Sequence, residues 1–198
     1  MAGKVISAMY IITKEPSVFS IGNFPWDENG VKPETQVSVS YDEGGFLVSF
    51  VSYETNVRAV ETEHNSPVHE DSCMELFAAF ASDDDRYINI EVNPNGAAHC
   101  ELGVGRGDRI AISPEDINTL GIKTAVYGDR WEVSYYIPTS FIQKYLPTYK
   151  HGNGTVFKGN FYKCGDKTGH AHYGCFNNIP WQHPDFHRPE FFAEFTLA

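Results

Sequence analysis

Residues 69–96 read HEDSCMELFAAFASDDDRYINIEVNPNG, and this stretch decides the fold. In its second half the apolar side chains of Ile88, Ile90 and Val92 alternate with polar positions 87, 89, 91 and 93. Successive side chains of a strand point to opposite faces of a sheet, so the apolar row belongs to a core and the polar row faces away from it. Asparagine is depleted in strands because its side chain competes for backbone hydrogen bonds. Two asparagines and a glutamate on one strand face therefore indicate a functional surface.

Short strand patterns continue on both sides of this stretch. Upstream, strands are predicted over residues 37–41 and 46–53, joined by a turn at residues 42–45. The second of them carries apolar residues on both faces, which predicts a central strand. Residues 75–80 and 87–93 form the next pair, and Asn95-Gly96 turns the chain into a strand over 97–102. Further strands are predicted over residues 122–127, 130–137, 156–164 and 190–197.

This pattern predicts an all-β fold, a two-sheet antiparallel β-sandwich with one short helix. The helix is expected over residues 138–146, beginning at a Thr139 or Ser140 cap and ending at Pro147. The chain has 198 residues without a linker or repeat, so a single domain over 1–198 is expected.

The composition excludes some partners. A net charge of −11 argues against nucleic acid or an anionic membrane surface, because phosphate binding needs clustered Lys and Arg. No run of 18 apolar residues and no apolar signal core is present. We therefore expect a cytoplasmic protein, or a secreted one if a signal has been removed.

Neither a cofactor nor a disulfide is expected. The four cysteines lack C-x-x-C spacing, and for Cys73 and Cys164, which lie in predicted strands, a small buried hydrophobe is favoured over a thiolate role. Two features leave a metal ion open. His170 and His172 are either a metal-binding pair or part of an ordinary strand, and Asp83-Asp84-Asp85 is either a structural calcium site or a solvated turn.

Several motifs together carry a resemblance to a known family. They are Asn23-Phe-Pro-Trp26, Asp71-Ser-Cys-Met-Glu-Leu-Phe77, Tyr87-x-Asn89-x-Glu91-x-Asn93 with Gly96, Gly159-Asn-Phe-Tyr-Lys-Cys164 and Pro184-Asp-Phe-His-Arg-Pro-Glu190. Over nearly its whole length the chain resembles the carbohydrate-binding family 9-like proteins, which are relatives of the family 9 carbohydrate-binding modules of xylanases and belong to the DOMON-type sandwiches. The resemblance implies a jelly-roll or DOMON-like sandwich that binds a mono- or oligosaccharide without bond chemistry.

The resemblance also implies a set of site residues. In the xylanase modules two aromatic rings sandwich a terminal sugar, while carboxylate, amide and arginine groups hold its hydroxyls. Carried over by motif, the polar positions fall on Glu75, Asn89, Glu91, Asn93 and Asn160. One aromatic position falls near His69, which is not a tryptophan, and the second near Trp181 or Phe186. Glu91 stands where those modules use an arginine.

The residues themselves favour the same ligand class. Sugars present paired hydroxyls, which match the planar donors and acceptors of Glu, Asn and Arg, and an apolar C–H face that stacks on a ring. Glu75 shares a face with positions 89, 91 and 93 if the two strands pair as a hairpin. Arg106 between glycines and Lys163 are further candidate contacts, and Trp181 in a Pro-rich loop is either a plug or a platform. Weak binding is expected, since each hydrogen bond contributes about 0.5–1.5 kcal/mol.

Three function classes remain open from sequence. The first and preferred one is a non-catalytic saccharide-binding protein. The second is a glycan-active enzyme that uses Glu75 and Glu91 as a carboxylate pair, as glycosidases do. In the third, the polar strand face is an internal network joining the sandwich to a covering loop, and the chain is a structural or interaction domain with a decayed sugar site.

Overall fold

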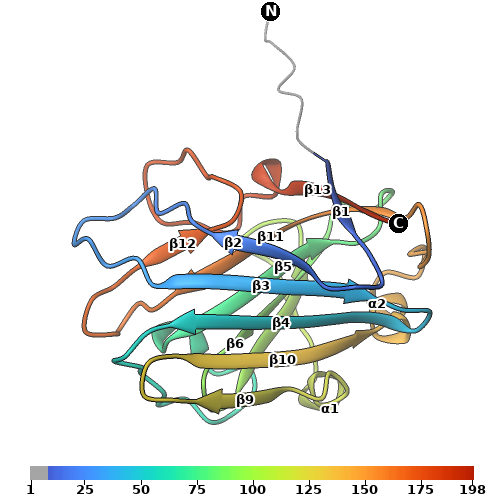
Figure 1. Cartoon of the computed structure of the whole chain (residues 1–198). Coiled ribbons are helices and arrows are strands. Elements are labelled where there is room, and N and C mark those ends of the chain that lie inside the picture. The colour runs from blue at the N-terminus through green and yellow to red at the C-terminus, as the bar shows by residue number, and fades with distance from the viewer. Residues whose placement is uncertain (1–8) are drawn as a thin grey trace, which may run out of the picture.

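The computed structural model describes residues 9–198 and contains two packed β-sheets (Figure 1). One sheet has five strands in the order β2–β3–β4–β10–β9, with bounds Ser17–Ile21, Glu34–Tyr41, Gly45–Tyr53, Trp131–Pro138 and Lys123–Val126. The other has eight strands in the order β1–β13–β11–β5–β6–β7–β8, with β12 also paired to β11. Their bounds are Met9–Ile12, Ala193–Leu197, Val156–Cys164, Cys73–Ala79, Tyr87–Val92, Ala98–Gly103, Ile110–Ala111 and, for β12, Tyr173–Cys175. The predicted β-sandwich is confirmed.

The meander predicted from residues 75–102 is present as β5, β6 and β7. These strands pair antiparallel, and the register sets Glu75 directly opposite Glu91. Gly96 adopts a φ of 78° in the turn between β6 and β7, a conformation that glycine reaches without steric cost. β1 and β13 are the exception to antiparallel pairing, since they run parallel.

The main core lies between the two sheets. On β10 the predicted apolar row, formed by Trp131, Val133, Tyr135 and Ile137, is fully buried there. Burying each such side chain contributes roughly 1.5–3 kcal/mol relative to leaving it in water. The alternation of apolar residues along β10 therefore holds the five-stranded sheet against its partner.

The eight-stranded sheet is buried on both faces near its centre. Every residue of β6, and all but the last of β5, is shielded from solvent. Its second face packs under residues 176–192, which follow β12 and which we call the covering segment. Phe186 and Phe192 of this segment form a second apolar cluster with Phe77, Tyr87 and Tyr162 of the sheet. The polar row of β6 thus lies beneath a covering layer.

β4 differs from its prediction in one respect. It is the central strand of its sheet, as expected, but only one of its faces is buried. Leu47 and Tyr53 on the other face are exposed to solvent. The apolar residues on both faces of β4 therefore predicted its central position correctly, but they do not indicate that both faces are buried.

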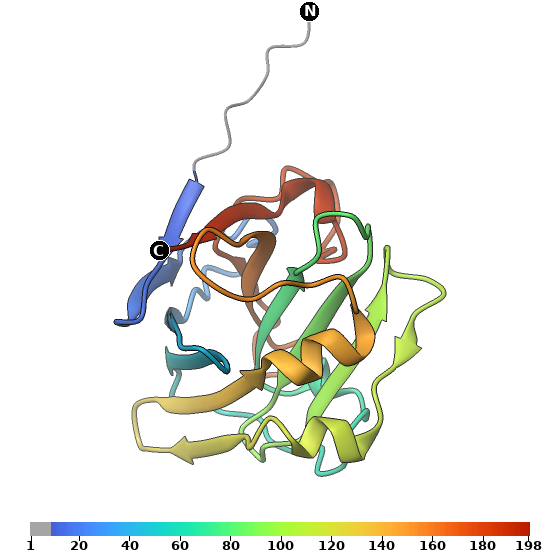
Figure 2. The ribbon, with the colours of Figure 1, turned by 90° about the vertical axis from the view of Figure 1, so that its right-hand side faces the viewer.

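The helices lie at the end of the sandwich that faces the viewer in Figure 2. The predicted helix is α2, Thr139–Tyr145, but Pro138 occupies its N-cap and no side chain caps it, so the Thr139 or Ser140 cap is wrong. A second helix, α1, spans Pro114–Asn118 after a Ser113 cap that accepts a hydrogen bond from Asp116 N at 3.2 Å. Two single-turn 3₁₀ helices, η1 (Val68–Glu70) and η2 (Pro189–Phe191), complete the structure; η2 replaces the start of the strand predicted from residue 190. In the chain from residue 9 onward, none of the helices is long and apolar enough to cross a membrane.

A buried carboxylate ties the loop before β5 to the meander. Asp71, which is fully buried, accepts hydrogen bonds from the backbone N–H groups of Val60 and Glu61 at 2.9 and 2.8 Å. It also accepts from the Asn93 amide at 2.8 Å and pairs with the Arg58 guanidinium. Since a buried carboxylate is stable only when its oxygens are hydrogen-bonded, this cage fixes the chain on one side of the site described below.

We expect the Asp71→Ala variant to lose about 3–5 kcal/mol of unfolding free energy, because the buried donors around Asp71 would lose their acceptor. Urea denaturation followed by tryptophan fluorescence measures this loss. Asp85→Ala, in an exposed turn, is the matched control and should change the free energy by less than about 0.5 kcal/mol. A loss below about 1 kcal/mol for Asp71→Ala would contradict the anchoring role.

Candidate functional site

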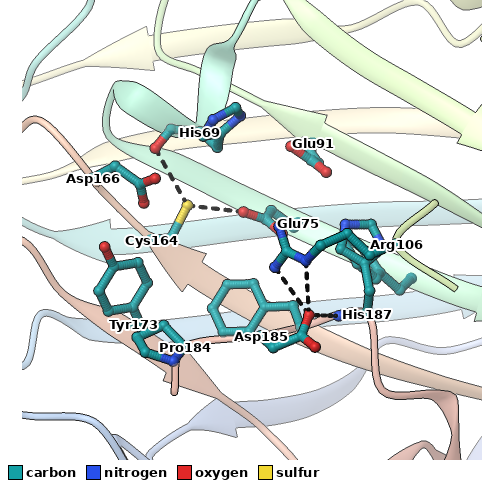
Figure 3. A pocket seen from close by; sticks show the side chains of 12 residues that line it. His69, Glu75, Glu91, Arg106, Cys164, Asp166, Tyr173, Pro184, Asp185 and His187 are labelled. Carbon is teal, nitrogen blue, oxygen red and sulfur yellow. Dashed lines mark hydrogen bonds and ion pairs between the residues drawn. The ribbon is translucent and has the colours of Figure 1, made fainter.

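A hollow of about 190 Å³ opens on the second face of the eight-stranded sheet, beside the covering segment (Figure 3). Twelve residues from β5, β6, β11, β12 and the adjoining loops line it. They are His69, Glu75, Phe77, Glu91, Arg106, Cys164, Asp166, Tyr173, Pro184, Asp185, Phe186 and His187. Segments far apart in the sequence therefore build one site.

The floor of the hollow is formed by side chains of paired strands. Glu75 on β5 lies opposite Glu91 on β6 and opposite Tyr162 on β11, so these side chains share one face. Cys164, two residues beyond Tyr162, shares it as well, and its thiol lies 2.8 Å from Glu75 Oε1. The prediction that Glu75 and Glu91 project to the same side is confirmed by the register.

Loops supply the rim. Arg106, in the connection between β7 and β8, reaches Asp185 of the covering segment with Nη2–Oδ1 and Nε–Oδ1 distances of 2.9 and 3.2 Å (Figure 3). His187 donates its backbone N–H to the same Asp185 oxygen at 3.1 Å. Its ring accepts the Tyr87 hydroxyl at Nδ1, 2.7 Å away. Burial, with Arg109 and Arg106 nearby, lowers the pKa of His187 to about 3, so this imidazole is neutral and can accept that hydrogen bond.

The pKa values of the two carboxyl groups on the floor, Glu75 and Glu91, are both raised. Burial, followed by the Cys164 thiol and the Glu91 carboxylate, raises the pKa of Glu75 well above its usual value. Burial also raises the pKa of Glu91, against the opposing effect of His99, His69 and the Asn89 amide. A protonated carboxyl donates one hydrogen bond and accepts others, so the floor can both donate to and accept from a polar ligand.

Asn89 positions Glu91 and does not line the hollow. It is fully buried, and its Nδ2 donates to Glu91 Oε1 at 3.0 Å. Its Oδ1 accepts from Arg109 Nη2 at 2.6 Å. The Arg109 guanidinium stacks on the Tyr87 ring at 4.3 Å and pairs with Glu101 at 3.2 Å. A chain of hydrogen bonds from Arg109 through Asn89 therefore fixes the Glu91 carboxylate.

The other two predicted asparagines also lie outside the hollow. Asn93 donates to Asp71 and to the Glu61 carbonyl, each at 2.8 Å, and so closes the Asp71 cage. Asn160 exchanges hydrogen bonds with the backbone of Asn177, donating at 2.9 Å and accepting at 2.8 Å. Both are fully buried. Asn93 and Asn160 therefore join the sandwich to its covering loops. This is the internal polar network that the third function class drawn from sequence describes.

Lys163 lies on the opposite face of β11 from the hollow. Its fully buried ammonium contacts Glu54 Oε2 at 3.1 Å, His172 Nε2 at 2.8 Å and the Cys164 carbonyl at 2.9 Å. It therefore belongs to a polar cluster at one end of the sandwich. Lys163 was a candidate ligand contact from sequence, but it does not line the hollow. It lies three residues after Asn160, and residues three apart on a strand point to opposite faces.

The predicted rings have different environments. Phe186 lines the hollow, with one face stacked on Tyr162 at a centroid distance of 4.2 Å and an interplanar angle of 9°. Trp181 is 45% exposed but lies outside the hollow, and Arg188 covers one face of its ring at 3.5 Å. His69 lines the rim. Tyr173, which the sequence did not single out, is half-buried at the rim and adds another aromatic ring to the hollow.

The two metal possibilities drawn from sequence have protein partners. Asp83 accepts the Thr148 hydroxyl at 2.7 Å, and Asp84 pairs with Arg86. His172 donates Nδ1–H to the His170 carbonyl at 2.9 Å while its Nε2 faces Lys163, so both ring nitrogens are engaged. Residues 170 and 172 precede β12 and do not share a strand face.

Half of the residues predicted for the site line the hollow: His69, Glu75, Glu91, Arg106 and Phe186. The residues missed by sequence reasoning include Cys164, Asp166, Asp185 and His187. Two of these could have been proposed from sequence, because Asp185 and His187 are the neighbours of Phe186 in the Pro184–Glu190 motif. Cys164 lies four residues after Asn160, so the alternation of side chains along a strand places both on the same face. It could have been predicted from this spacing.

A family model and several solved structures match this chain. The model of carbohydrate-binding family 9 matches residues 8–197. A "putative carbohydrate-binding protein" from Bacteroides uniformis has a similar structure, with a TM-score of 0.83 and 28% identity, over 92% of this chain and 87% of that one.

Two structures of a family 9 carbohydrate-binding module from Caldicellulosiruptor kristjanssonii share the fold at 14% identity. The complex with cellotriose has a TM-score of 0.62 over 96% of this chain and 93% of that one. The complex with glucose has a TM-score of 0.64 over 96% of both chains. No curated protein matches.

The raised pKa of Glu75 predicts a pH dependence of stability. The folded protein holds a proton that the unfolded chain releases near the usual pKa of 4.5, so this group stabilises the fold at low pH and the contribution is lost as pH rises above 4.5. Relative to Glu75→Gln, wild type should lose up to about 1.4 kcal/mol per pH unit above that pH. Urea denaturation between about pH 4.5 and about pH 8 measures the difference. Parallel curves for the two proteins would contradict it, and Glu132→Gln, on the outer face of the five-stranded sheet, is the control.

Proposed function

The chain belongs to carbohydrate-binding family 9, and from this premise we propose that it is a non-catalytic protein that binds one sugar unit of a saccharide in the hollow beside the covering segment. The observation that carries the proposal is the convergence of Glu75, Glu91 and Arg106 with aromatic side chains on that one hollow. These are the group types that match paired hydroxyls and the C–H face of a sugar ring.

The size of the hollow supports a single sugar ring. At about 190 Å³ it is smaller than the pockets of roughly 300–1,000 Å³ that enclose drug-sized ligands. It is also open on one side, so further sugar units of a chain extend into solvent. The Caldicellulosiruptor kristjanssonii module, which has the same fold, has been solved with both glucose and cellotriose.

The carboxyl groups and the aromatic rings contact different parts of the sugar. Glu75 and Glu91 hydrogen-bond neighbouring hydroxyls from the floor, and Arg106 reaches the ligand from the rim. Tyr173 offers the apolar surface, because Phe186 already has one face stacked on Tyr162. A few such contacts, at about 1.5–3 kcal/mol for each charged hydrogen bond, correspond to a Kd of about 0.1–1 mM after the cost of association.

We expect Glu91→Ala to weaken saccharide binding by at least about tenfold, because it removes a charge-assisted acceptor from the floor. Isothermal titration with glucose and with cellotriose measures the change. The matched control is Glu132→Ala, on the outer face of the five-stranded sheet, which should bind as wild type does. Equal affinity of wild type and Glu91→Ala would contradict the proposed site. A wild type that binds no saccharide at millimolar concentration would favour a structural domain.

The carboxylate pair also allows a direct test of the enzymatic alternative. Membership of a binding family supports the absence of turnover. We therefore expect no release of new reducing ends from cello- or xylo-oligosaccharides during long incubation with the protein. Product formation that is abolished in Glu75→Gln would overturn the non-catalytic assignment, since glycosidases need two carboxyl groups about 5–10 Å apart.

A further inference from the structure

Two thiols and a carboxyl group meet beside the hollow, which Cys164 and Glu75 line and behind which Cys73 is fully buried. Cys73 on β5 is directly opposite Cys164 on β11, and Glu75, two residues beyond Cys73, lies on the same face. The two sulfur atoms and a Glu75 oxygen all lie within 4.8 Å of one another. Within residues 9–198 no other three Cys, His, Asp or Glu side chains come this close. The cluster is therefore specific to this place in the fold.

The other two cysteines give an internal comparison. Cys100 packs in the core between the sheets, and the Cys175 thiol lies 3.6 Å from the Asn23 carbonyl. All four cysteines are buried and free. Packing alone accounts for Cys100, whereas the Cys73–Cys164 pair sets two soft donors beside a carboxyl group.

The spacing suits a tetrahedral metal ion. Metal–sulfur and metal–oxygen bonds of about 2.3 and about 2.1 Å place ligand atoms of a tetrahedral zinc ion about 3.6–3.8 Å apart. The ligand atoms of the cluster lie at most 4.8 Å apart, and Cys164 Sγ lies 2.8 Å from Glu75 Oε1. Side-chain adjustments of about 1 Å therefore suffice to reach that geometry.

The surroundings leave one position open and favour a cation. Cys164 and Glu75 line the hollow, so a fourth ligand can reach the cluster from solvent (Figure 3). Glu91 and Asp166 add negative charge to the same hollow, while Arg106 is paired with Asp185. Sulfur donors select zinc-like ions over calcium or magnesium, which prefer oxygen.

We propose that Cys73, Cys164 and Glu75 bind a thiophilic divalent cation of the zinc class, with water from the hollow as fourth ligand. Three bonds to the metal form, and the two thiol protons, together with the proton of Glu75 where it is present, leave to solvent. No oxidant or reductant is needed. The inference does not rest on the saccharide proposal.

The protons set the pH dependence of this site. Burial raises the pKa of Cys73 to about 12, and hydrogen bonding to Cys73, together with burial, raises the pKa of Cys164 well above its usual value. Where the metal displaces both thiol protons, its affinity should increase about a hundredfold per pH unit, and about a thousandfold where Glu75 also carries a proton.

Cobalt(II) titration of reduced, chelator-treated protein tests the proposal. We expect one equivalent to bind, with thiolate-to-cobalt charge-transfer absorption that zinc abolishes. Cys73→Ser and Cys164→Ser should each reduce this absorption and weaken binding at least tenfold. Cys100→Ser, which changes a buried thiol outside the cluster, should behave as wild type does. No charge-transfer band in wild type, or an unchanged titration in both cluster variants, would overturn the proposal.

A second measurement needs no variant and covers the case in which a serine variant does not fold. X-ray absorption at the zinc edge of the wild-type complex should give two sulfur neighbours at about 2.3 Å. A shell of nitrogen and oxygen alone would refute the site. Saccharide titration of the metal-free protein separates the two proposals, because either can fail while the other holds.

Discussion

The centre of the eight-stranded sheet is covered on both faces, and this constraint shapes the whole site. β5 and β6 are shielded from water by the main core on one side and by residues 176–192 on the other. A polar group buried in this way costs free energy unless it is hydrogen-bonded, so each polar side chain on the second face needs a partner. Asn89, Asn93 and Asn160 obtain theirs from the protein itself. Glu75 and Glu91 lie where the cover is incomplete, and there the hollow opens.

This arrangement divides the polar side chains into two roles. The asparagines and Arg109 fix strands and loops, and they hold the Glu91 carboxylate in place. The carboxyl groups, Arg106 and the rings at the rim are left to meet a ligand. A site built on the centre of a sheet is rigid, because neighbouring strands constrain the backbone, and rigidity reduces the ordering cost of binding. Weak individual contacts can then add up to useful affinity.

The sequence was sufficient for the fold because its signals are local. Alternation along residues 87–93 and 131–137, with turn residues between, predicts strands that the structure contains. Part of the site was also predictable, because Glu75 and Glu91 follow from strand alternation and hairpin pairing. The position of the covering segment was not predictable: Asp185 and His187 flank Phe186 in a motif, but no periodicity indicates which face of the sheet they contact. Lys163 could have been separated from the other candidate contacts, because alternation places it on the opposite strand face from Asn160.

The central claim is that the hollow beside the covering segment holds a sugar ring. A crystal structure of the protein grown with glucose or cellotriose tests it most directly. The account predicts one sugar unit in the hollow, with hydroxyls within hydrogen-bond distance of Glu75 and Glu91 and a ring face against Tyr173. A saccharide bound on the outer face of the five-stranded sheet, with only water beside Glu75 and Glu91, would contradict it.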